Sequence, residues 1–184
     1  MKFLLLGVLA LSLIAPSQTM AANLESPSRL DGEWRLDWDR SDSFEPVMKA
    51  LEVSWLLRKL AGVARVGLEL RAVPLAEDCG HCIRNMLVTL KSPLSNNEIQ
   101  ISLDGVPRPG KDPRGRDTLD AYTWTEEGTL EMNREVELPS GKQARLLEVR
   151  RIDSDPNTLI STLDVWVEGT KRASVTRAFE RLSD

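Results

Sequence analysis

The sequence predicts an all-β fold, an antiparallel sheet with one helical insertion. After residue 62, apolar and polar residues alternate with a period of two through most of the chain. Short turn sequences rich in Gly, Asn, Asp and Pro interrupt this alternation at intervals typical of a meander. Strands that are joined by such tight turns run antiparallel. A sheet of many short strands is expected to close into a barrel or to pair into a sandwich, because closure removes its exposed edges.

The composition is that of a globular protein. The 184 residues include 24 Lys or Arg and 28 Asp or Glu, and 41% are hydrophobic. These proportions argue against a disordered chain, and the length suits one domain with its own core. The net charge of −4 offers no general attraction to nucleic acid or to anionic lipid. A single histidine, His81, excludes a histidine-rich metal site, and we expect no cofactor.

Residues 1–21 have the features of a signal peptide. A basic residue precedes the apolar run 3–14, and Thr19 and Ala21 place small residues at the −3 and −1 positions of a cleavage site. The apolar run is shorter than the roughly 20 residues that a membrane-spanning helix needs. We therefore expect no transmembrane segment, and a mature domain over 22–184 that is periplasmic or secreted.

The rest of the chain predicts one strand, a helical segment and then a series of strands. The first strand is expected at 30–36. The further strands are expected at 65–73, 83–91, 98–103, 119–125, 129–138, 143–152, 158–167 and 174–182. The stretch from Asp104 to Asp117 holds three prolines and three glycines, and it predicts a loop.

An apolar stripe at helical spacing follows the first strand and consists of Phe44, Val47, Met48, Leu51 and Trp55. Ser43 can cap the segment, Pro46 is tolerated in the first turn, and Gly62 can end it. We predict two short helices here, with the stripe packed on the core.

Four blocks of sequence follow one another in a recognisable order. They are Gly32-x-Trp34-x-Leu36; Phe44-x-x-x-Met48-Lys49-x-Leu51-x-Val53 with Arg58-Lys59-Leu60-Ala61; Val88-Thr89-Leu90-Lys91-Ser92 with Asn97-Glu98-Ile99-x-Ile101; and Gly169-Thr170 with Thr176-Arg177-x-Phe179-Glu180. In this order they resemble the intracellular lipid-binding proteins, the fatty-acid-binding family, over most of residues 30–182. The resemblance implies an antiparallel, up-and-down barrel of about ten strands, with a helix-turn-helix lid after the first strand.

The resemblance also implies a non-catalytic protein that reversibly holds a small hydrophobic or amphipathic ligand, such as a fatty acid. In the family, an Arg-x-Tyr pair on the last strand and an arginine on an earlier strand hold the ligand's carboxylate. Arg177 and Phe179 occupy the places of the pair, so the hydroxyl group is missing. Phe44 and Met48 are the candidate ligand contacts in the helical block.

The second arginine of the head-group site has two candidates, Arg150 and Arg151. As neighbours on a strand, they face opposite sides of the sheet. The family pattern of an arginine followed two residues later by an aliphatic residue favours Arg150, with Ile152. Glu148 shares the face of Arg150, and its pairing with an internal arginine would leave no anion site.

Cys79-Gly80-His81-Cys82 lies in a predicted turn. In an oxidising compartment, two cysteines at this spacing predict a structural disulfide between Cys79 and Cys82. A redox-active pair is the alternative, and the chain would then be a thiol-redox protein.

A further alternative is an exported barrel with a filled interior that binds a protein partner, such as an inhibitor or envelope-assembly factor. The sequence carries no nucleophile motif, and we expect no enzyme activity.

Overall fold

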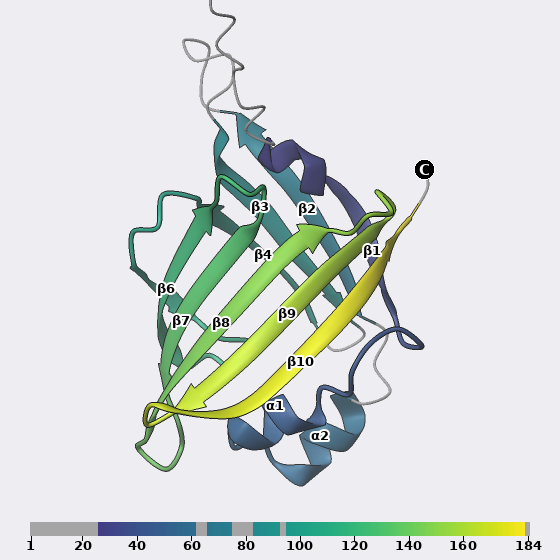
Figure 1. Ribbon diagram of the computed structural model, residues 1–184. Coiled ribbons are helices and arrows are strands. Elements are labelled where there is room, and N and C mark those ends of the chain that lie inside the picture. The colour runs from purple at the N-terminus through teal and green to yellow at the C-terminus, as the bar shows by residue number, and fades with distance from the viewer. Residues whose placement is uncertain (1–25, 62–65, 75–82, 93–94, 183–184) are drawn as a thin grey trace, which may run out of the picture.

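The computed structural model describes residues 26–61, 66–74, 83–92 and 95–182, which form one curled antiparallel sheet with two short helices at one end (Figure 1). The strands are β1 (Gly32–Asp37), β2 (Gly67–Pro74), β3 (Ile83–Ser92), β4 (Ser95–Ser102), β5 (Arg108–Lys111), β6 (Asp117–Trp124), β7 (Leu130–Glu137), β8 (Gln143–Ile152), β9 (Thr158–Val167) and β10 (Thr170–Arg181). The helices are the 3-10 helix η1 (Pro27–Leu30), α1 (Glu45–Ala50) and α2 (Trp55–Ala61).

The sheet follows an up-and-down order that brings the first and last strands together. The order is β4-β3-β2-β1-β10-β9-β8-β7-β6-β5, and Leu36 of β1 lies opposite Phe179 of β10. β4 and β5 are therefore the two edge strands of the sheet. An isolated bridge pairs Asp104, which follows β4, with Thr123 of β6. The predicted all-β fold of ten antiparallel strands is confirmed, as a curled half-barrel.

The predicted pair of short helices is also confirmed. Ser43 Oγ accepts a hydrogen bond from the Glu45 N–H at 3.3 Å, and the chain leaves α1 through Glu52, whose φ is 56°. Arg58 of α2 ties the two helices together, because its Nη1 donates to the Val53 carbonyl oxygen at 2.6 Å and its Nε lies 3.8 Å from the Glu45 carboxylate. α1 packs against β9 and β10 (Figure 1). We call α1 and α2 the helical lid.

Two sequence expectations were wrong. The apolar stripe was predicted to pack on the core as far as Trp55, but Trp55 is 62% exposed, and Leu56, Leu57 and Leu60 of the same helix are exposed as well. The predicted loop over 104–117 contains β5, which pairs with β6. Pro109 is tolerated there because β5 is an edge strand. Gly110 is required by a close approach, since a Cβ at this position would lie 2.8 Å from Asp120 Oδ2.

Two apolar clusters fill the two ends of the half-barrel. The lid-side cluster consists of Val47, Val136, Leu138, Ala144, Leu146, Leu163, Val165, Val167, Ala173 and Val175. The far cluster, beside η1, consists of Leu30, Trp34, Leu36, Leu68, Leu70, Met86, Val88, Ile101, Leu103, Leu130, Leu159 and Phe179. On the inner faces of β8, β9 and β10, polar residues separate the residues of the lid-side cluster from those of the far cluster. The candidate site lies at this polar layer.

Candidate functional site

The polar layer is built by the register of the last three strands. Arg177 of β10 lies opposite Ser161 of β9, and Ser161 lies opposite Arg150 of β8. Residues two apart on a strand share a face, so Glu148 joins Arg150 and Phe179 joins Arg177 on the inner side. The structure therefore brings together Arg177, Phe179 and Arg150, three of the residues that the sequence singled out.

Glu148 is held by a dense set of hydrogen bonds. Arg150 Nε donates to Glu148 Oε1 at 2.8 Å and Arg150 Nη2 donates to Oε2 at 2.9 Å, while Ser161 Oγ donates to Oε1 at 2.6 Å. Burial by itself raises the pKa of Glu148, but the charge and hydrogen bonds of Arg150, the bond from Ser161 and the charge of Arg177 together lower it below its ordinary value. Glu148 is thus a carboxylate at neutral pH, and it forms a closed pair with Arg150.

A second buried ion pair lies on β6 and β7. Arg134 Nε donates to Asp120 Oδ1 at 2.8 Å, and Arg134 Nη2 donates to Asp120 Oδ2 at 2.6 Å. The same Nη2 lies 3.3 Å from the Tyr122 hydroxyl, and burial raises the pKa of that hydroxyl. Sequence reasoning missed this pair, although Arg134 shares the inward face of Met132 and Val136. A charge at an inward position of a predicted strand was the available signal.

Arg177 differs from these arginines in its partners. It is half-buried, and its guanidinium carbon lies 5.0 Å from the centre of the Phe44 ring and 5.4 Å from that of Phe179. Burial lowers the pKa of Arg177, an effect that the charge of Glu148 opposes and that of Arg150 reinforces. Within the described residues, no carboxylate accepts a hydrogen bond from it. Arg177 is therefore an inner cation held between two aromatic faces.

The remaining predicted contacts lie on the lid and on β8. Phe44, at the N-terminal end of α1, brings the lid to Arg177. Met48 is buried one turn later, and its N–H donates to the Phe44 carbonyl oxygen at 3.1 Å. Arg151 points away from the interior: its side chain is 52% exposed and lies 3.8 Å from Asp153. Arg150 is thus the inner arginine of the two, and its role in ligand binding stays a prediction.

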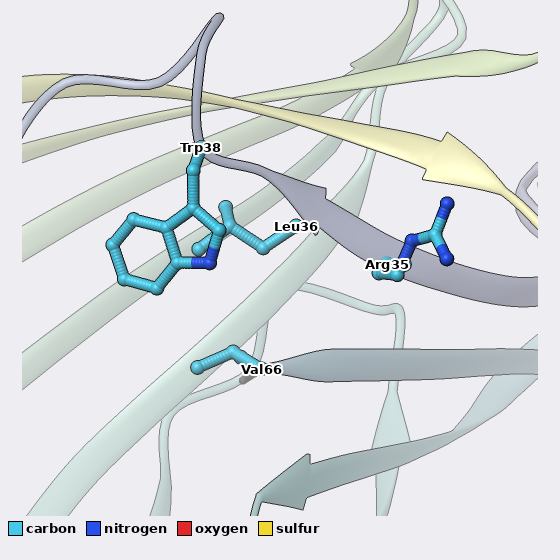
Figure 2. A pocket seen from close by; sticks show the side chains of 4 residues that line it. All are labelled: Arg35, Leu36, Trp38 and Val66. Carbon is cyan, nitrogen blue, oxygen red and sulfur yellow. The ribbon is translucent and has the colours of Figure 1, made fainter. Parts of the chain in front are cut away.

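A separate pocket of about 300 Å³ opens at the end of β1 and is lined by Arg35, Leu36, Trp38 and Val66. Figure 2 shows the side chains of Trp38, Leu36 and Val66 near one another, whereas Arg35 lies farther along β1. Arg35 forms an ion pair with Glu180 at 3.2 Å. Leu36 of the pocket lining also belongs to the far cluster. The size of the pocket is at the lower end of the range for small-molecule sites.

Other features of the described residues carry less chemistry. No helix in the described ranges is long and apolar enough to cross a membrane. Among the same residues, no group of His, Cys, Asp and Glu side chains could hold a metal ion. Cys79 and Cys82 lie outside the described residues, so their disulfide stays a prediction.

Solved structures of similar shape were found for this chain. Lipid binding protein 8 of Caenorhabditis elegans matches with a TM-score of 0.66 and 16% identity, over 85% of this chain and 98% of that protein. The fatty acid binding protein of Schistosoma mansoni, in complex with arachidonic acid, matches with a TM-score of 0.63 and 21% identity, over 86% of this chain and 99% of that protein. As-p18, an extracellular fatty acid binding protein, matches with a TM-score of 0.61 and 14% identity, over 85% of this chain and 98% of that protein. This chain has the fold of the fatty-acid-binding proteins.

The fatty-acid-binding-protein fold thus confirms the architecture that the sequence blocks implied, over nearly the whole length of the similar structures. No family model and no curated protein matches the sequence. Because a fold accommodates many functions, the function has to be argued from the inner face itself.

Proposed function

We propose that this chain is a non-catalytic binding protein that reversibly holds a small amphipathic ligand, similar to a fatty acid, inside its barrel. The observation that carries the proposal is Arg177. Its guanidinium is half-buried between Phe44 of the lid and Phe179 of β10. An arginine does not lose its proton inside a protein, so a desolvated one gains from an anionic partner. A ligand's acidic head group supplies that partner.

Two further observations support the proposal. Proteins of the same fold bind fatty acids, and the Schistosoma mansoni protein is in complex with arachidonic acid. Apolar clusters lie on both sides of the polar layer, which suits a ligand with one polar end and an apolar chain. The contact of Phe44 with Arg177 couples the lid to the head-group position, so the lid is the element that has to move for exchange.

Titration of the delipidated protein with a fluorescent fatty acid tests the proposal. We expect saturable binding to one site. Arg177→Met should weaken this binding by at least about tenfold, because the variant loses a hydrogen bond to the charged head group. Arg151→Met is the matched control, because it removes an arginine from the solvent side of β8 and should bind like the wild type. A protein that binds no amphiphile of any chain length contradicts the proposal.

We also propose that the protein works outside the cytoplasm, in the periplasm or after secretion, once residues 1–21 have been removed. The signal-peptide features of the sequence support this location, and As-p18, which has the same fold, is extracellular. N-terminal sequencing of the protein, expressed with its own leader, is expected to begin at Ala22. An intact Met1 on a protein that stays in the cytoplasm contradicts it.

A further inference from the structure

In the polar layer between the two clusters, the inner faces of β6 to β10 carry an excess of positive charge. Arg181, at the far end of β10, lies outside this layer and donates to the carbonyl oxygens of Asp31 and Arg29. In the described structure, the guanidinium groups of Arg134, Arg150 and Arg177 share this space with the carboxylates of Asp120 and Glu148. Each carboxylate forms a bidentate pair with one arginine, and the side chains of both pairs are 11–18% exposed. The pairs balance Arg134 and Arg150, so the uncompensated charge is that of Arg177.

Glu148 occupies the place that the resemblance assigns to a ligand's carboxylate, against Arg150. Both of its oxygen atoms accept hydrogen bonds from Arg150, and one of them also accepts from Ser161. A ligand that displaced Glu148 from Arg150 would leave a buried carboxylate without its paired cation, which is strongly unfavourable. Arg150 is therefore closed to the ligand, and Arg177 is the cation that remains for the head group.

We propose that Glu148 determines the specificity of this barrel: as the built-in counter-ion of Arg150, it limits the interior to ligands with one negative charge, bound at Arg177. The inference rests on the proposed function, that the barrel holds an amphipathic ligand. A monoanion such as a carboxylate balances the excess charge. A neutral head group leaves it unbalanced, and a dianion such as a phosphate monoester brings one negative charge too many into a medium of low dielectric constant.

Three ligands with the same alkyl chain and different head-group charge test the inference. Isothermal titration calorimetry at about pH 8, where the phosphate is a dianion, compares decanoic acid, decan-1-ol and decyl phosphate. The wild type is expected to bind the acid at least about tenfold more tightly than either of the others. Glu148→Gln keeps the shape of the side chain and adds one net positive charge to the interior. It should raise the phosphate-to-acid affinity ratio by about tenfold or more.

Two variants separate the charge of Glu148 from its structural role. Glu131→Gln removes the same charge from the exposed outer face of β7 and should leave both ligand ratios as in the wild type. The double variant Glu148→Gln/Arg150→Gln restores the net charge of the interior. It should return the phosphate-to-acid ratio to the wild-type value and keep the preference for the acid, because Arg177 is intact.

The outcomes distinguish this inference from the function on which it rests. An unchanged phosphate-to-acid ratio in Glu148→Gln overturns the inference. If Glu148→Gln does not fold, as judged by circular dichroism, the double variant decides: loss of its acid preference places the head group on Arg150 and overturns the inference as well. If neither the wild type nor any variant binds one of the three compounds, the proposed function itself fails.

Discussion

Phe179 is the residue whose aromatic ring meets the inner cation from the last strand. It is 6% exposed, and its ring centre lies 5.4 Å from the guanidinium carbon of Arg177. Phe179→Tyr adds a hydroxyl on the inner face, where it can donate to a charged head group. Such a hydrogen bond contributes about 1.5–3 kcal/mol, which is roughly tenfold or more in affinity. We expect binding of a fatty acid to tighten relative to its methyl ester in a fluorescence titration. An unchanged acid-to-ester ratio argues against the head-group position at Arg177.

Glu148 makes a second prediction at the scale of a residue, on the pH dependence of stability. A carboxyl group whose pKa is lowered on folding stabilises the protein above its unfolded value, near 4.5, and loses that contribution as the pH falls through the folded value. Burial opposes this lowering, and the charge and hydrogen bonds of Arg150 exceed it. The free energy of unfolding of Glu148→Gln should therefore fall less steeply than that of the wild type below about pH 4.5. Urea titrations across this range measure it, and parallel profiles for the two proteins contradict it.

At the scale of an element, the two helices of the lid make unequal contributions to stability. Val47 of α1 is fully buried in the lid-side cluster, whereas Leu56 of α2 is 61% exposed. Val47→Ala should lower the free energy of unfolding by about 2 kcal/mol, because it removes two buried methyl groups and leaves a cavity. Leu56→Ala is the matched change on the exposed helix and should alter it by less than about 0.5 kcal/mol. Equal losses in urea titrations of the two variants would show that α2 also packs against the sheet.

The elements also show how far a sequence pattern can predict structure. The alternation of apolar and polar residues located β8 and β9 to the residue, because a half-buried strand imposes that pattern on its own sequence. β5 carries no such pattern: it is a short edge strand over Arg108–Lys111 that pairs through its backbone and tolerates Pro109. Trp55 fits the helical stripe, but its exposure depends on how α2 sits against the sheet, which local spacing does not encode.

Some features of the candidate site could be predicted from one segment of sequence, and others depend on contacts between segments that are far apart in the chain. That Arg177 and Phe179 share a face follows from their spacing, and the choice of Arg150 over Arg151 followed from the family pattern. The pair of Asp120 with Arg134 depends on the register between β6 and β7, and the sandwich of Arg177 by Phe44 depends on where the lid docks. Neither relation is contained in one segment of sequence. The pairing of Glu148 with an internal arginine was an alternative that the sequence already raised, and its partner is Arg150. The hydrogen bond from Ser161 depends on the register between β8 and β9.

At the scale of the whole molecule, the ligand is expected to complete a core that the protein leaves divided. The lid-side and far clusters are separated by the charged layer, so an amphiphile that spans the layer adds contacts to both. A ligand at about one hundred times its dissociation constant stabilises the folded state by about 2.7 kcal/mol. For a domain of this size, that corresponds to a rise in melting temperature of roughly 5–10 °C. Circular dichroism melts with and without decanoic acid measure the rise. In Arg177→Met the rise should be smaller at the same ligand concentration, because a ligand that binds more weakly stabilises the folded state less. A wild-type melting temperature that does not change with ligand concentration is incompatible with a ligand held inside the folded barrel.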